Sequence, residues 1–214
     1  MTAAMRWSAC GLIALAFFIA LGAVVAGRPP LAVDLEAARF WFGRGTETAW
    51  WLTQSGYGLA LSATGLLALG AAIVLRREVS GVVLTLIAQG CSQAAAAWLK
   101  TIFARPRPPH WLMHHEGGFS YPSGHAVTAV VFYGGLAAVA ANSSLPLGLR
   151  RLVAIALAGW AIGIAWSRVA LGAHYVTDVV GGLLFGATWF CLVRAIESAR
   201  RAPGADIPLN VDQG

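Results

Sequence analysis

Six long apolar runs, separated by short polar stretches, dominate the sequence. They cover residues 8–27, 57–75, 80–99, 124–141, 152–166 and 176–193. A transmembrane helix needs about 20 mostly apolar residues, and most of the runs come close to that length. The fifth run is short, and we expect Arg151 and Arg168 at its ends to extend it by reaching toward the two membrane surfaces. The pattern predicts an all-α fold, an integral membrane bundle of six transmembrane helices.

The domain organisation is predicted to be simple. Without an internal repeat or a low-complexity linker, we expect one membrane domain over residues 1–201 and a disordered cytoplasmic tail over residues 202–214. The first run has a second interpretation, because Arg6, the apolar stretch and Val24-Val25-Ala26 resemble a secretory signal with its cleavage site. We favour a retained helix, since the run is longer than a usual signal core.

The composition agrees with a membrane protein. The chain is 58% hydrophobic and 11% charged, whereas an average soluble domain is about 25% charged. So few charges cannot cover a water-facing surface, which excludes an ordinary soluble domain. The net charge is +6, but no run rich in Lys and Arg exists, so we predict no nucleic-acid partner. Cys10, Cys91 and Cys191 lie inside apolar runs without metal-ligand spacing, and we expect them to be small buried residues.

The positions of the basic residues predict the orientation. With a cytoplasmic N-terminus, the inner side carries Arg6, Arg76, Arg77, Arg150, Arg151, Arg194, Arg200 and Arg201. The outer side carries Arg28, Arg39, Arg44, Lys100, Arg105, Arg107 and Arg168. The positive-inside rule favours cytoplasmic termini once the outer residues with a chemical role are set aside. All five histidines and Asp178 then lie on the outer face.

The segment between the first two runs is amphipathic. It begins with Pro29-Pro30, and one side of a helix there would carry Leu31, Leu35, Ala38 and Phe42. Its tryptophans are of the kind found at membrane interfaces: Trp41, Trp50 and Trp51. We keep two interpretations open, a lipid-facing lip beside a site and a plain connecting loop with aromatic anchors.

Three cations are predicted to meet at one membrane depth. Lys100, Arg107 and Arg168 come from separate segments, and without a partner they would repel one another. A phosphate group would hold them together, and arginine binds its oxygens in a bidentate manner. The alternative is that basic residues merely flank the ends of the helices. This explains Arg76-Arg77 on the inner side well, but an excess of basic residues is not expected on the outer side.

The sequence Pro122-Ser123-Gly124-His125 opens the fourth run. Ser123 is a typical N-cap residue, and Gly124 lets a ligand approach the backbone. The N–H groups of a first helical turn bind anions, and His125 would lie within reach of such an anion. The alternative is a capped helix with an interfacial histidine.

His174 and Asp178 are four residues apart, so they share one face of a helix. The carboxylate would accept the Nδ1–H group of the imidazole and leave Nε2 as a nucleophile or base. A metal site would need further ligands, such as His114 and His115, and the nearby cations would oppose it. We therefore predict no metal and no cofactor.

Together these residues predict phosphoryl transfer. His174 would attack phosphorus, Asp178 would orient it, and His125 would protonate the leaving oxygen and then activate water. The transferred group would be stabilised by Lys100, Arg107, Ser123, Gly124 and Arg168. Two alternatives stay open: a transporter or binding protein for anionic lipids, and a phosphotransferase that uses another lipid as acceptor.

The three clusters resemble the signature of the phosphatidic acid phosphatase type 2 superfamily. Its pattern K-x6-R-P, P-S-G-H, S-R-x5-H-x3-D matches Lys100, Arg107-Pro108, the segment 122–125, Ser167-Arg168, His174 and Asp178. The resemblance implies the roles given above and a bacterial inner-membrane phosphatase, facing outward, whose partner is a phosphorylated membrane lipid. The stretch 121–136 looks most like undecaprenyl-diphosphate and broad lipid phosphatases, so undecaprenyl diphosphate is the predicted substrate. The alternatives are phosphatidylglycerophosphate, phosphatidic acid and lipid A phosphates. Arg105 lies outside the signature and is predicted as a secondary phosphate contact.

Overall fold

The computed structural model describes residues 1–112 and 117–201, and the secondary structure of these residues is entirely helical. The long helices are α1 (Ala3–Val25), α4 (Gly58–Val74), α5 (Val79–Phe103), α8 (Leu147–Ala170) and α9 (Val176–Arg200). A further continuous helix, Gly124–Asn142, consists of α6 (Gly124–Thr128), the π-helical turn η1 (Ala129–Gly134) and α7 (Gly135–Asn142). Two short helices, α2 (Ala32–Trp41) and α3 (Thr46–Gln54), connect α1 to α4. Each predicted apolar run forms most of one long helix, so the all-α prediction is confirmed.

Five of these helices are long and apolar enough to cross a membrane, namely α1, α5, Gly124–Asn142, α8 and α9. The sixth predicted span, α4, reaches that length only together with α3, to which it is joined at a bend of 59°. Large apolar side chains cover the outside of the bundle, for example Leu59, Leu67 and Ile162. Such a surface is typical of helices that face lipid. The chain is therefore a multi-pass membrane protein with five or six spans.

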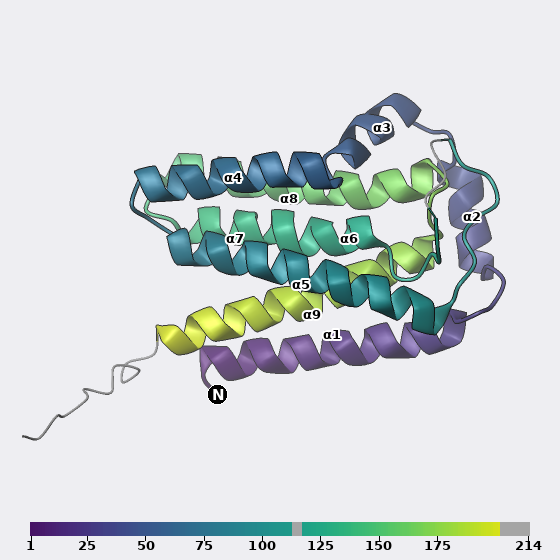
Figure 1. Cartoon of the computed structure of the whole chain (residues 1–214), viewed down its shortest axis with the longest axis horizontal. Coiled ribbons are helices and arrows are strands. Elements are labelled where there is room, and N and C mark those ends of the chain that lie inside the picture. The colour runs from purple at the N-terminus through teal and green to yellow at the C-terminus, as the bar shows by residue number, and fades with distance from the viewer. Residues whose placement is uncertain (113–116, 202–214) are drawn as a thin grey trace, which may run out of the picture.

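The helices run up and down, so the bundle has two different ends (Figure 1). We call the end formed by residues 26–57, 104–112, 117–123 and 171–175 the site end, and the end where α1 begins and α9 stops the terminus end. Helix α2 lies across the site end and contacts α8 and α9. The chain leaves α5 after Phe103 because the prolines at 106, 108 and 109 cannot continue a helix.

Helix α1 is packed against α9 (Figure 1). Its Phe18 is buried, stacks on Tyr121 with ring centroids 5.4 Å apart, and contacts Phe103 and Phe185 edge-on or tilted. The Tyr121 hydroxyl donates a hydrogen bond of 2.7 Å to the Phe18 carbonyl oxygen. This packing makes α1 part of the core, which supports the interpretation of the first run as a retained helix.

Two sequence-based expectations about the spans are wrong. The fifth run does extend into a helix of 24 residues, α8, but Arg168 is completely buried instead of reaching a membrane surface. Cys10 and Cys91 are exposed, and of the three cysteines Cys191 is the buried one. A helix face toward lipid only has to be apolar, so a small apolar residue within a span need not lie in the protein core. The predicted tail, residues 202–214, lies outside the described residues.

Candidate active site

Backbone hydrogen bonds at the site end join the segments that the sequence singled out. The Ser123 N–H group donates to the Asp178 carbonyl oxygen at 3.0 Å, which ties the start of α6 to the start of α9. The N–H groups of Ala173 and His174 donate to the Arg168 carbonyl oxygen at 3.0 and 3.1 Å, which closes the turn between α8 and α9. The predicted site residues are therefore held next to one another by the main chain.

The contacts of His174 fix its tautomer. Its Nε2 atom lies 3.1 Å from an Arg107 guanidinium nitrogen, and because a guanidinium only donates, Nε2 must be the acceptor. We therefore assign the ring proton to Nδ1, which lies 3.5 Å from Oδ2 of Asp178. That distance is too long for a well-formed hydrogen bond, although the two atoms face each other. The arrangement leaves a lone pair on Nε2, as a nucleophile requires.

The surroundings of His174 favour the neutral imidazole. The side chain is 3% exposed, and burial lowers its pKa well below the usual value. The positive charges of Lys100, Arg107 and Arg168 lower the pKa further. All three predicted cations thus lie close enough to His174 to act on it, and the imidazole is neutral at pH 7.

Backbone carbonyl groups orient two of these cations. The Lys100 ammonium donates to the Phe119 carbonyl oxygen at 2.9 Å. The Arg107 guanidinium donates to the carbonyl oxygens of Gly118 and Ala173, each at 3.2 Å. Carbonyl groups position a cation without neutralising its charge. Their arrangement therefore suits the binding of an anion beside His174.

Ser123 has the backbone conformation of an N-cap residue, but its side chain makes no capping hydrogen bond. The predicted N-cap position is therefore confirmed, without the side-chain bond that usually accompanies it. Among the described residues, the buried Ser123 hydroxyl has no hydrogen-bond partner. An unsatisfied buried hydroxyl is unfavourable and is common where a ligand binds. A phosphate oxygen at the start of α6 would provide the missing partner.

His125 lies in the first turn of α6 and is 8% exposed. Its Nε2 atom is 3.2 Å from the Thr53 carbonyl oxygen at the end of α3. A carbonyl oxygen only accepts, so Nε2 carries a proton. The ring also packs edge-on against Tyr57, with centroids 4.7 Å apart. The bend between α3 and α4 therefore positions the predicted general acid.

Two residues near the bend were missed by the sequence analysis. Thr53 is fully buried, and its hydroxyl accepts a hydrogen bond from Arg168 while its carbonyl contacts His125. At Gly56, an added Cβ atom would lie only 2.3 Å from the His125 ring. Neither residue belongs to the family signature. The Gly-Tyr-Gly sequence at 56–58 was the one local sign of a sharp change in chain direction.

Arg105 does not fill its predicted role as a phosphate contact. Its side chain is fully buried and forms ion pairs with Asp34 at 2.6 Å and with Asp178 at 2.5 Å. The guanidinium group is therefore paired with two carboxylates of the protein instead of with a phosphate. Asp34, on α2, was also missed, because a single Asp in an amphipathic helix usually faces water.

The apolar face of α2 lies beside the site. A cavity of about 500 Å³ is lined by Leu35, Ala38 and Phe42 of α2 together with Pro108 and His174. The structure thus favours the lip interpretation over the plain connecting loop. Within residues 1–112 and 117–201, no group of three or more His, Cys, Asp or Glu side chains is arranged to hold a metal ion. His114 and His115, the extra ligands considered above, lie outside these residues.

Comparisons with known proteins agree with this arrangement. The PAP2 superfamily profile matches residues 78–202, more than half of the chain. Phosphatidylglycerophosphatase B of Bacillus subtilis is 32% identical over 130 residues, which are 60% of this chain and 64% of that protein. Lipid A 1-phosphatase of Rhizobium johnstonii is 38% identical over 114 residues, 48% of this chain and 41% of that protein. The chain thus spans less than two thirds of these relatives.

A solved structure resembles the whole bundle. It is described as the first transmembrane PAP2 type phosphatidylglycerolphosphate phosphatase from Bacillus subtilis. It superposes with a TM-score of 0.75 and 27% sequence identity, covering 88% of this chain and 96% of that one. The likeness therefore extends beyond the segment matched by the superfamily profile, into the part of the chain that precedes it.

Proposed function

The chain belongs to the PAP2 superfamily, and on this basis we propose that it is a membrane lipid phosphatase that works through a phosphohistidine intermediate. The observation that carries the proposal is the geometry of His174. Its Nε2 lone pair is directed at Arg107, within a group of cations that would hold a phosphate. A protein that only binds or transports anions would not need an oriented, neutral imidazole there.

In the first step, Nε2 of His174 attacks phosphorus, and the bond from phosphorus to the lipid oxygen breaks. His125 starts the cycle with a proton on each ring nitrogen. The lipid oxygen leaves with the proton from Nδ1 of His125, while the Nε2–H group stays hydrogen-bonded to the Thr53 carbonyl oxygen. Asp178 faces Nδ1 of His174 and stabilises the positive charge that the imidazole acquires. The products are the free lipid alcohol, or the lipid monophosphate from a diphosphate, and phospho-His174.

In the second step, water attacks phospho-His174 and releases inorganic phosphate. Nδ1 of His125 takes a proton from this water and returns to its starting state. Lys100, Arg107 and Arg168 stabilise the negative charge of the transferred group in both steps. The N–H groups at Ser123 and Gly124, together with the unsatisfied Ser123 hydroxyl, are the predicted donors from α6. No metal or cofactor is needed for this scheme.

The proposed substrate is a phosphorylated lipid that stays in the bilayer while its headgroup enters the site end. The names of the relatives favour phosphatidylglycerophosphate and lipid A, whereas the stretch 121–136 favours undecaprenyl diphosphate. We place phosphatidylglycerophosphate first, because relatives from Bacillus subtilis and Haemophilus influenzae and a solved structure are named for that substrate. In the proposed orientation, both termini are in the cytoplasm of a bacterium and the site end faces outward across the inner membrane.

The test is a panel of lipid phosphates, with and without EDTA, given to the purified protein in detergent. The panel contains phosphatidylglycerophosphate, lipid A, undecaprenyl diphosphate and phosphatidic acid. We expect phosphate release that persists in EDTA, acid-labile phosphate on His174 after brief exposure, and no release by His174→Ala. Arg151→Gln, an exposed change at the terminus end, is the matched control and should behave as the unmodified protein.

Other outcomes would replace the proposal. Normal turnover by the His174→Ala variant would contradict the phosphohistidine mechanism. Movement of lipid across a vesicle membrane without hydrolysis would identify a transporter. Consumption of the substrate with phosphate transferred to a second lipid, instead of released, would identify a phosphotransferase.

A further inference from the structure

A buried network of charges connects α2 to the proposed nucleophile. Arg105 lies at its centre, with one guanidinium nitrogen 2.6 Å from Asp34 and the other 2.5 Å from Asp178. All three side chains are completely buried. A buried charge is costly unless it is paired, so each member depends on the others. Asp34 and Arg105 are not part of the family signature, and Asp34 lies outside the matched segment 78–202.

The two carboxylates occupy equivalent positions on their helices. Asp34 is the third residue of α2, and its Oδ2 atom accepts the Leu31 N–H group at 2.9 Å. Asp178 is the third residue of α9, and its Oδ2 atom accepts the Tyr175 N–H group at 2.9 Å. Negative charge is favourable at a helix N-terminus. Arg105 therefore links the first turns of two helices, each of which supplies a carboxylate.

Asp34 also contacts the start of α9 directly. Its Oδ1 atom accepts hydrogen bonds from the backbone N–H group and the hydroxyl of Thr177, at 3.0 and 2.7 Å. The Thr177 hydroxyl lies 2.7 Å from Arg105 as well. A carboxylate on α2 thus satisfies a free N–H group in the first turn of α9, which is the turn that carries Asp178.

We propose that Asp34 is a positioning residue for the reaction, acting through Arg105 and Thr177 to fix the Asp178 carboxylate against Nδ1 of His174. Arg105 holds the Oδ1 atom of Asp178, which leaves Oδ2 facing the imidazole. Without Asp34, Arg105 can turn toward Asp178, and the first turn of α9 loses one of its hydrogen-bond acceptors. The inference rests on the proposed function, because its effect is on the orientation of the nucleophile.

The test compares Asp34→Asn with Glu36→Gln. Glu36 lies on the same helix, where it pairs with Arg39, and both side chains are more than two-thirds exposed. We expect Asp34→Asn to lower kcat by about 10- to 100-fold, since small misplacements of a reacting group have effects of this size. The KM and the inhibition constant of inorganic phosphate should not change, because Asp34 binds Leu31, Arg105 and Thr177, none of which is a phosphate ligand in the proposed mechanism. The control should match the unmodified protein in all three values.

A second set of variants tests the network itself. Arg105→Gln leaves two carboxylates without their shared cation and should be less active than Asp34→Asn. Adding Asp34→Asn to Arg105→Gln removes one of these charges, and we expect this to restore part of the lost kcat. Thr177→Val is a milder change for use if Asp34→Asn does not fold, and it should lower kcat by about 3-fold, the effect of one weak hydrogen bond.

The outcomes separate this inference from the proposed function. An inactive His174→Ala variant with a fully active Asp34→Asn variant would overturn the positioning role alone. The positioning role would also be overturned if Asp34→Asn lowered kcat and weakened inhibition by inorganic phosphate by the same factor. That result would show that the variant had lost the phosphate site itself. An active His174→Ala variant would instead overturn the proposed function.

Discussion

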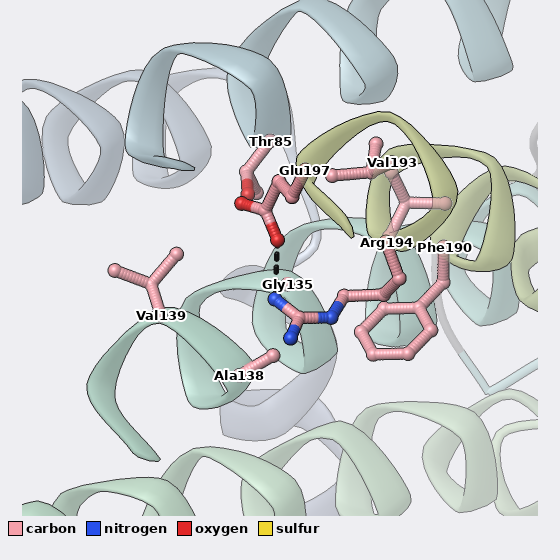
Figure 2. Close-up of a pocket in the computed structure, with 9 residues that line it drawn as sticks. Thr85, Gly135, Ala138, Val139, Phe190, Val193, Arg194 and Glu197 are labelled. Carbon is pink, nitrogen blue, oxygen red and sulfur yellow. Dashed lines mark hydrogen bonds and ion pairs between the residues drawn. The ribbon is translucent and has the colours of Figure 1, made fainter. Parts of the chain in front are cut away.

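The two ends of the bundle each bury charged side chains, but they do so in different ways. At the site end, the Arg105 network joins α2, the chain after α5, and α9. At the terminus end, the ion pair of the half-buried Arg194 and the buried Glu197 belongs entirely to α9 (Figure 2). One arrangement connects segments distant in sequence, and the other stabilises a single helix.

The surroundings of these charges also differ. The space beside Arg194 and Glu197 is about 10 Å³, near the lower limit for one water molecule. It is lined by apolar side chains of α7 and α9, including Val139 and Phe190 (Figure 2). The cavity beside His174 is about 500 Å³. Buried charge therefore indicates a site only where it comes from several segments and adjoins a space large enough for a ligand.

The largest difference in activity between a change at the site end and a change at the terminus end is expected when Lys100→Gln is compared with Arg151→Gln. Lys100 is a predicted phosphate ligand, and loss of one such donor lowers kcat by about 10²- to 10³-fold in other enzymes. Arg151 is exposed at the start of α8, and its loss should leave catalysis unchanged. The measurement is kcat/KM for phosphate release by the two variants.

Lys100→Gln should also change the pH profile. In the proposed mechanism the neutral form of His174 reacts, and its lowered pKa moves the acid limb of kcat/KM below about 6.5, the ordinary value for histidine. Lys100 contributes to this lowering, so its removal should raise the pKa and move the limb to higher pH. If the acid limb of kcat/KM lies at the same pH in the variant and in the unmodified protein, the electrostatic role of Lys100 is contradicted.

The sequence predicted the parts of the site whose geometry is local. The spacing of His174 and Asp178 places both on one helical face, and Pro122-Ser123-Gly124-His125 opens a helix wherever it lies in the fold. The partners of Arg105 could not be predicted from the sequence, because Asp34 is 71 positions away along the chain and Asp178 is 73 positions away. No local pattern tells which of several arginines will meet a distant carboxylate.

The same reasoning explains which features of the fold were predictable. Apolar runs gave the long helices, since length and hydrophobicity suffice to define a span. They did not reveal the π-helical turn Ala129–Gly134 or the bend between α3 and α4. Both depend on how one helix packs against its neighbours. The bend matters for function, because it presents the Thr53 carbonyl oxygen to His125.

A smaller effect is expected from Gly56→Ala at this bend. The new Cβ atom would lie 2.3 Å from the His125 ring, so the imidazole must move away from its place beside Thr53. Displacement of a general acid by a fraction of an ångström should lower kcat by about 10- to 100-fold. The control is Gly58→Ala, where an added Cβ atom meets nothing within 4 Å. Equal activity of the two variants would show that the His125 position tolerates the shift.

The smallest catalytic effect is expected from Glu197→Gln at the terminus end. Glu197 is 8% exposed, and it pairs with Arg194. This pair lies at the opposite end of α9 from Asp178. Because both side chains keep some contact with solvent, the loss should cost about 1 kcal/mol, equivalent to a decrease in Tm of about 2–4 °C. The kcat and the pH profile should match those of the unmodified protein. A tenfold loss of kcat would mean that the terminus end is coupled to the site through α9, whose first turn carries Asp178, and that the two buried groups of charges act as one.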